Sequence, residues 1–149
     1  MTGPGVGQAG GMPGWTCSEC GRQFGRVGQS HECAPALTVD EYFATGPAHE
    51  RPVFDAVMRQ LEEVGPVHVE PVSVGIFLKN PRKFAELRPL QRWTALSFYL
   101  RRPARHRTIV RKVVRYGGKY LHVANVAGPP DLDEGLCSLL TEAYDEAAS

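Results

Sequence analysis

Three cysteines and one histidine near the N-terminus have the types and the spacing of a metal site. Two residues separate Cys17 from Cys20, and one residue separates His31 from Cys33. Two cysteines at the first spacing direct both sulfurs toward one point from a tight turn, and two side chains at the second spacing project from the same side of an extended segment. The set matches the closed tetrahedral ligation of structural Zn²⁺. We therefore predict one structural Zn²⁺ at these four residues; the alternative is a set of free or redox-active cysteines.

A run of cations in the second half of the chain could also carry chemistry. Between Leu87 and Pro130 there is no acid, yet this stretch holds ten of the 17 Lys and Arg residues of a chain whose net charge is +1. Guanidinium groups suit phosphate oxygens because each presents a planar fork of donors, so DNA or RNA is a predicted partner. The predicted nucleic-acid-binding residues are Arg101, Arg102, Arg105, Arg107, Arg111, Lys112 and Arg115. Neighbouring aromatic residues could stack on bases, namely Trp93, Tyr99, Tyr116 and Tyr120.

The same cations also have an ordinary explanation. The tail from Asp131 to Ser149 carries six acids and no base, so it can neutralise the cations within the molecule. Charged side chains on the wet face of a sheet also serve solubility alone. Under this alternative the protein is a module for binding another protein or a small ligand. The sequence leaves both hypotheses open.

Catalytic motifs are absent from the sequence. It contains no Gly-rich phosphate loop ending in Lys-Ser/Thr, no His-Glu-x-x-His and no Gly-x-Ser-x-Gly. Cys137 and His122 could be imagined as a nucleophile and a base, but Cys137 falls on the apolar face of a predicted helix and His122 lies in a predicted strand. We therefore predict a non-enzymatic protein, with no catalytic residue and no identified small-molecule substrate; an enzyme of an unlisted type is the third reading.

Composition predicts one main domain with two additions at its N-terminus. A chain of 149 residues with 42% hydrophobic content can bury one sizeable core. Residues 1–14 are rich in Gly and Pro and are predicted to be a disordered arm, residues 15–34 the zinc knuckle, and residues 35–149 the main domain. Neither a signal peptide nor an apolar run of about 18 residues is visible, so we expect a cytoplasmic protein with no membrane partner.

The main domain alternates between helical and strand patterns. Thr38 and Glu41 form a capping box that predicts a helix start, and a helix is expected from about residue 47 to residue 64. Gly117-Gly118 between two strand-like runs predicts a hairpin, and Asp131 is predicted to cap a closing helix. The predicted strands are 67–69, 72–78, 84–87, 93–100, 109–116 and 119–126.

Together these patterns predict the fold class. It is α+β, with an antiparallel sheet of about five to six strands packed against N-terminal and C-terminal helices. Alternation within the run 93–100 places Thr94, Leu96, Phe98 and Leu100 on the face that meets the core.

A family resemblance rests on two sets of residues. The run Trp15-x-Cys17-x-x-Cys20-Gly21-Arg22-x-Phe24, followed by Gln29-x-His31-x-Cys33, resembles the knuckle of an uncharacterised bacterial family, common in actinobacteria, called domain of unknown function 5655. The main domain is similar through Tyr120-x-His122-Val123 and segment 131–144, so the resemblance covers about residues 15–147. Ser18 stands where the family often has proline. Fusions of related domains to nuclease-like domains imply an association with nucleic acid, and the family supplies no catalytic residues.

Overall fold

The computed structural model describes residues 14–18, 21–29 and 38–148. Its first helix, α1 (Val39–Phe43), begins at the predicted capping box: the Glu41 N–H donates to Thr38 Oγ1 at 3.0 Å, and the Thr38 N–H donates to Glu41 Oε1 at 2.8 Å. Helix α2 (Glu50–Glu62) is shorter than the predicted 47–64. Its buried apolar side chains, Val53, Phe54, Val57 and Leu61, recur at helical spacing, as the sequence predicted.

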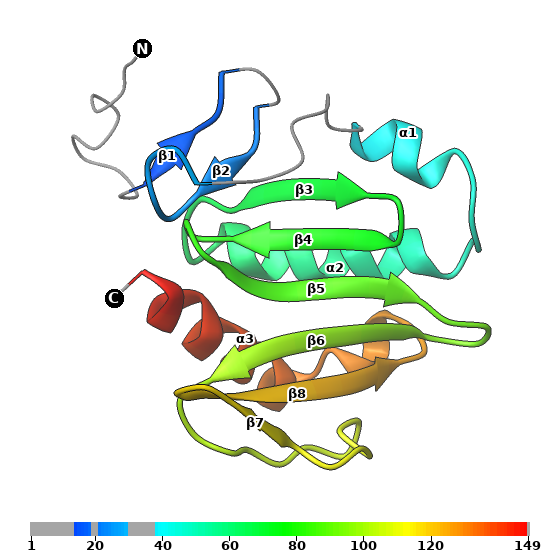
Figure 1. Ribbon diagram of the computed structural model, residues 1–149. Coiled ribbons are helices and arrows are strands. Elements are labelled where there is room, and N and C mark those ends of the chain that lie inside the picture. The colour runs from blue at the N-terminus through cyan, green and yellow to red at the C-terminus, as the bar shows by residue number, and fades with distance from the viewer. Residues whose placement is uncertain (1–13, 19–20, 30–37, 149) are drawn as a thin grey trace.

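Six antiparallel strands form the main sheet (Figure 1). They are β3 (His68–Val72), β4 (Gly75–Lys79), β5 (Lys83–Pro89), β6 (Thr94–Leu100), β7 (Val114–Tyr116) and β8 (Lys119–Val126), in the spatial order β3-β4-β5-β6-β8-β7. Helices α2 and α3 (Glu134–Ala147) cover one face, behind the sheet in Figure 1. The predicted α+β fold class is confirmed.

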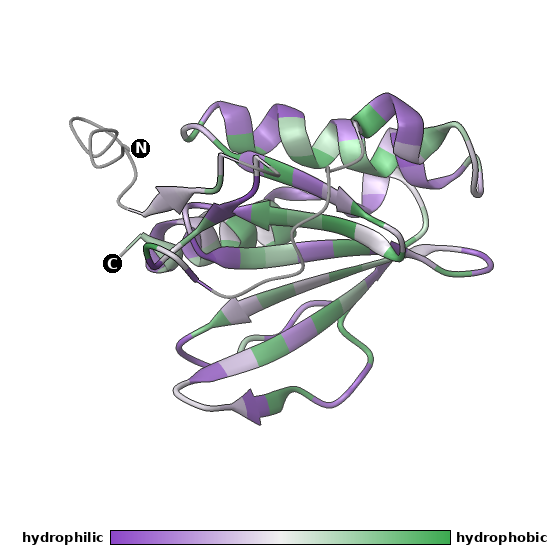
Figure 2. Ribbon diagram, turned by 45° about the horizontal axis from the view of Figure 1, so that its top comes forward, coloured by the Kyte–Doolittle hydropathy of each residue, from purple (hydrophilic) through white to green (hydrophobic). Residues whose placement is uncertain are grey.

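The register divides the sheet into a helix face, which packs on α2 and α3, and an open face. Leu87, Leu96 and Ala124 are paired neighbours on the helix face and are fully buried. The predicted core face of β6 is confirmed, since its members, Thr94, Leu96, Phe98 and Leu100, are all 0% exposed. Hydrophilic and hydrophobic residues follow one another along β8 in Figure 2, as expected of a strand with one covered face.

Two sequence expectations at the C-terminal end were wrong. The run 109–116 was expected to be one strand, but only β7 pairs with β8, and residues before it form a loop whose Thr108 carbonyl accepts from the Asn125 N–H at 3.0 Å. The cap of α3 is Asp133, whose side chain accepts from the Leu136 N–H, while Asp131 ends a 3-10 turn, η2 (Pro129–Asp131). The two prolines start this extra turn and so displace the helix start by two residues.

A second, two-stranded sheet lies near the N-terminus. Strands β1 (Trp15–Thr16) and β2 (Gln23–Phe24) pair antiparallel, and Trp15 packs on Phe24 with ring centroids 5.8 Å apart. We call residues 14–18 and 21–29 the N-terminal hairpin. The predicted arm lies outside the described residues, Gly14 excepted.

Candidate functional site

Three of the seven predicted nucleic-acid-binding residues are occupied within the molecule. Arg102 makes a bidentate ion pair with Glu142: its Nε donates to Oε2 at 2.9 Å and its Nη2 donates to Oε1 at 2.7 Å. The backbone N–H of Arg101 donates to Glu146 Oε1 at 2.9 Å, and its guanidinium donates to the Glu146 carbonyl at 3.3 Å. Arg107 is the third and pairs with Asp131. For these residues the ordinary explanation holds, because acids of the segment 131–146 neutralise or bind them.

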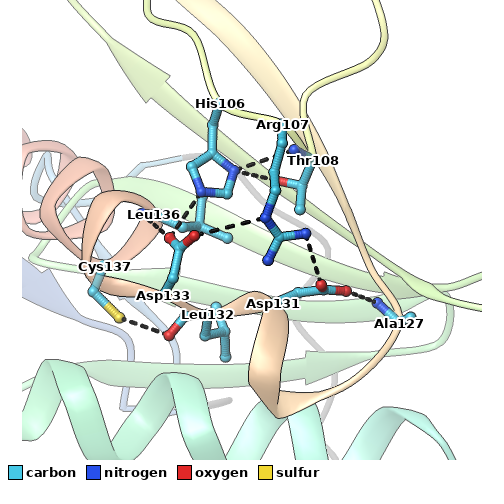
Figure 3. Close-up of polar contacts among 9 residues, drawn as sticks. All are labelled: His106, Arg107, Thr108, Ala127, Asp131, Leu132, Asp133, Leu136 and Cys137. Carbon is cyan, nitrogen blue, oxygen red and sulfur yellow. Dashed lines mark hydrogen bonds and ion pairs between the residues drawn. The ribbon is translucent and has the colours of Figure 1, made fainter.

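The third residue belongs to a cluster that ties the loop to the start of α3 (Figure 3). Arg107 donates to Asp131 at 3.0 Å and lies 3.7 Å from Asp133. The Thr108 N–H donates to His106 Nδ1, so Nε2 of that ring carries the hydrogen that bonds Asp133 at 2.8 Å. The pKa of Asp133 is lowered, first by the hydrogen bond from the Leu136 N–H and then by His106. The pKa of Asp131 is also lowered, first by the hydrogen bond from the Ala127 N–H and then by Arg107. The carboxylates of Asp131 and Asp133 both bind residues of the loop that precedes β7, so the cluster fixes this loop to the start of α3.

Four of the predicted cations remain exposed and form no ion pair in the described part of the chain. Arg105 and Arg111 lie in the loop that precedes β7, Lys112 follows in the same loop, and Arg115 lies on β7 itself. The hypothesis of a nucleic-acid contact therefore narrows to the edge of the sheet formed by β7.

The structure brings together two of the four predicted stacking aromatics. Tyr99 and Tyr116 share the open face with ring centroids 6.1 Å apart, and Lys119 Nζ lies 6.0 Å from the Tyr99 centroid. Tyr120 pairs with Leu100 and so lies on the helix face. Trp93 precedes β6 and belongs to neither group.

Two further aromatic rings carry a cation on the same side of the sheet. Lys83 Nζ lies 4.1 Å from the centroid of Phe77, and Lys79 Nζ lies 4.7 Å from that of Phe24. We call the three pairs Phe24–Lys79, Phe77–Lys83 and Tyr99–Lys119, together with Tyr116, the aromatic–cation track. Sequence reasoning missed its first half. The alternation of Phe77 and Lys79 on one strand face was the available signal.

Parts of the track are directly continuous. Lys83, Tyr99 and Lys119 line one small depression at the end of the sheet. Phe24 and Lys79 are buried, and Lys79 and Lys83 are paired with Glu70 and Glu86. The Tyr99–Lys119 pair with Tyr116 therefore offers the stacking surface and the positive charge that a base with its phosphate requires.

A buried ion pair attaches the N-terminal hairpin to the open face. Glu70 is 3% exposed and Lys79 is 8% exposed, and their charged atoms lie 3.0 Å apart. Glu70 accepts from the Gln23 N–H at 2.9 Å, and Lys79 donates to the Gln23 carbonyl at 2.8 Å. Burial works to raise the pKa of Glu70, but His68, Gln23 and Lys79 together outweigh burial and lower it. Whether the knuckle docks on the main domain was open from sequence; the described hairpin does dock.

The imagined pair of His122 and Cys137 has no catalytic arrangement. His122 is fully buried, its Nε2 accepts from the Ala104 N–H at 2.9 Å, and its Nδ1 donates to the Tyr120 carbonyl at 3.0 Å. Burial lowers the pKa of His122. With both ring nitrogens engaged, the ring is a structural neutral histidine, as expected. Burial also raises the pKa of the Cys137 thiol, which disfavours a thiolate.

A second buried acid lies at the opposite end of the molecule from the hairpin contact. Glu50 is 2% exposed, and the Tyr42 hydroxyl donates to it at 2.9 Å. Burial raises the pKa of Glu50, and burial with this hydrogen bond also raises that of Tyr42. The two side chains join α1 to α2 beside a pocket of about 390 Å³ that Arg88 also lines.

Residues 39–147 match the family described as "Domain of unknown function (DUF5655)". The chain belongs to this family. No curated protein and no solved structure matches the chain. The family description assigns no activity.

The zinc ligands lie outside the part of the chain that matches DUF5655, and most lie outside the described residues. Cys20, His31 and Cys33 are not described, so the predicted site stays a prediction. Cys17 is described and is 4% exposed. Its N–H donates to the Arg22 carbonyl at 2.9 Å, and its carbonyl accepts from Gly21 at 2.8 Å.

The described residues lack two kinds of feature, a metal-binding cluster and a membrane-spanning helix. No group of three or more His, Cys, Asp or Glu side chains among them is placed to hold a metal ion. Within the same residues, no helix of this DUF5655 protein combines the length and the apolar character needed to cross a bilayer.

Proposed function

We propose that this protein binds single-stranded nucleic acid along the open face of its sheet and catalyses no reaction. The observation that carries the proposal is the aromatic–cation track, which ends beside the exposed cations of the β7 edge. Each base that stacks on an aromatic ring contributes roughly 1–3 kcal/mol, and Lys and Arg neutralise the phosphates between the bases.

Single strands fit the track better than a duplex does. Rings on a sheet face can stack only on bases that are not already stacked and paired within a helix. Tyr116, 66% exposed on the edge strand, is the ring most accessible to such a base. The proposal therefore includes preference for an unpaired strand, with little dependence on sequence.

The test is fluorescence anisotropy with a labelled oligothymidylate and with a duplex of the same length. Four cations are available to phosphates: Arg105, Arg111, Lys112 and Lys119. Arg115 is left out because it pairs with Tyr120 and so lies on the helix face. At a slope of about −0.7 per neutralised phosphate, raising salt from about 50 to 200 mM should weaken single-strand binding about fiftyfold. Absence of binding at the lower salt, or tighter binding to the duplex, overturns the proposal.

A charge-matched pair of variants separates a local contact from a change of net charge. Arg111→Glu should weaken binding several-fold, because it reverses a charge beside β7. Arg59→Glu makes the same change of net charge on α2, behind the sheet, and should have little effect. Equal losses in both variants would leave no role for the β7 edge.

A second candidate function is a protein-interaction module. β7 is the last strand of the sheet, and the nearby apolar side chains Val110 and Val114 are 71% and 52% exposed. An exposed edge strand can accept a strand of another protein through backbone hydrogen bonds. Such a complex should survive moderate salt, whereas the nucleic-acid complex should not.

We also propose that Cys17, Cys20, His31 and Cys33 hold one structural Zn²⁺. The tight turn that follows Cys17, with Gly21 at φ +78°, supports this, because a metal knuckle needs a turn that aims two sulfurs at one point. Protein purified without chelator should contain one zinc per chain, and Cys17→Ser should lower that content. No metal in the wild-type protein contradicts the proposal.

A further inference from the structure

The pocket beside Glu50, of about 390 Å³, lies at the end of the sheet where α1, the β3–β4 turn and the end of β5 meet (Figure 1). Its volume falls in the range of small-molecule sites. Acidic, aromatic and apolar side chains are among its walls: Glu41, Glu50, Tyr42, Val72, Val74 and Pro89. None of these residues belongs to the aromatic–cation track, so an inference from this pocket is independent of the proposed function.

Glu50 is the buried acid of this pocket, and its charge is poorly compensated. It is 2% exposed, and its Oε2 accepts a hydrogen bond from the neutral Tyr42 hydroxyl at 2.9 Å. Burial raises the pKa of Glu50 more than Tyr42 and His49 together lower it. His49 does not pair with the carboxylate, because its Nε2 is bonded to the Trp93 carbonyl at 3.2 Å.

Glu70, the other buried acid of the described residues, is compensated within the protein. Lys79 Nζ lies 3.0 Å from it, and the Gln23 N–H donates to it at 2.9 Å. These partners, with His68, outweigh burial and lower the pKa of Glu70. A buried carboxylate without a cation is strongly unfavourable. The described part of the chain supplies such a cation to Glu70 and none to Glu50.

The second carboxyl oxygen of Glu50 is open to the pocket. Oε1 accepts no hydrogen bond from any described residue, and it is not fully enclosed by protein atoms. Arg88 also lines the pocket, but its guanidinium donates to Glu86 at 3.2 Å instead of to Glu50. A ligand in the pocket can therefore reach a carboxyl oxygen that has no donor of its own.

We propose that this pocket binds a small aliphatic primary amine in its ammonium form, with the ammonium at Glu50 Oε1 and the alkyl chain against Val72 and Val74. An ammonium group supplies both the positive charge and the donors that Glu50 lacks. Glu41, exposed beside the pocket, adds negative charge that favours a cation. The ligand is a plain alkyl amine or the amino group of an amino acid, whose carboxylate Arg88 would then bind.

The test is isothermal titration calorimetry of the full chain at low salt and near neutral pH, with isoamylamine, leucine and isovalerate. These three probes share one branched alkyl group and differ in charge. Isoamylamine should bind roughly tenfold more tightly than isovalerate, because only the amine brings a positive charge to Glu50.

A matched pair of variants tests the role of Glu50. Glu50→Gln keeps an acceptor for the Tyr42 hydroxyl but removes the charge, and should weaken isoamylamine binding roughly tenfold. Glu62→Gln makes the same change at an exposed site in the last turn of α2, away from the pocket lining, and should leave the binding unchanged.

A second pair of variants touches no buried residue. Val74 is 54% exposed in the β3–β4 turn and lines the pocket, so substitutions there should fold. Val74→Lys should weaken isoamylamine binding several-fold by repulsion, whereas Val74→Glu should not weaken it.

Three results overturn the inference: no isoamylamine binding at millimolar concentration, equal affinity in wild type and folded Glu50→Gln, or equal affinity in the two Val74 variants. Leucine bound more tightly than isoamylamine identifies an amino acid as the ligand, and leucine bound more weakly identifies an alkyl amine. Oligothymidylate binding without amine binding leaves the proposed function standing and this inference refuted; amine binding alone does the reverse.

Discussion

The buried pair of Glu70 and Lys79 allows a sharp prediction, because it attaches the N-terminal hairpin to the open face of the sheet. Lys79→Met keeps the length of the side chain but removes its charge. Glu70, which is 3% exposed, then keeps two neighbours: the Gln23 N–H, which donates to it, and His68 Nε2, which lies 3.0 Å from its carboxylate. That ring nitrogen makes no hydrogen bond, so it compensates Glu70 incompletely.

Removal of one member of a buried ion pair costs about 3–5 kcal/mol, since the remaining charge is left desolvated. We expect about 3 kcal/mol here, the lower end, because His68 remains close. That is a large part of a net stability of about 5–15 kcal/mol. The free energy of unfolding is measured by urea denaturation. The double variant Glu70→Gln/Lys79→Met removes both charges and should recover most of the loss.

The pH dependence has a definite sign. Because the pKa of Glu70 is lowered in the folded protein, the stability from Glu70 is present above its unfolded pKa of about 4.3 and is lost as pH falls through the folded pKa. The deficit of Lys79→Met should therefore shrink in acid, where Glu70 becomes protonated.

A matched control is Lys83→Met, which removes the cation above Phe77 from a partly exposed pair with Glu86. Partly exposed pairs contribute about 1 kcal/mol or less, so this variant should be nearly as stable as wild type. The reasoning fails if Lys79→Met costs no more than Lys83→Met, or if the double variant is as unstable as the single one.

Two further predictions concern the buried His122 and Asp133, the N-cap of α3. Since burial lowers the pKa of His122, the stability that neutral His122 contributes should fall as pH drops below about 6.5, where the unfolded chain takes up a proton. The urea midpoint of the wild-type protein should therefore decline between pH 8 and pH 5. The decline should be smaller in His122→Phe. Asp133→Ala removes the cap of α3 and the partner of His106, and should cost about 1–2 kcal/mol and speed tryptic cleavage of the loop before β7. Asp145→Ala, at an exposed site in the last turn of α3, should change neither the urea midpoint nor the cleavage rate.

The sequence determined the features that depend on neighbours along the chain. The capping box of Thr38 and Glu41 is correct because its partners are three residues apart, and the burial of alternate β6 residues is correct because side chains alternate on any strand. The β7–β8 hairpin followed from Gly117-Gly118, where Gly117 adopts φ +64°. The zinc ligands are likewise a prediction from spacing, which awaits metal analysis.

Only the tertiary structure decided which charges are available to a partner. Arg102 and Glu142 are 40 residues apart, and their pairing depends on α3 packing beside the end of β6. The aromatic–cation track likewise draws on β2, β4, β5, β6, β7 and β8, so no single stretch of sequence contains it. Composition counts charges, but Coulomb interactions act through space, and distances in space follow from which strands pair and which face the helices cover.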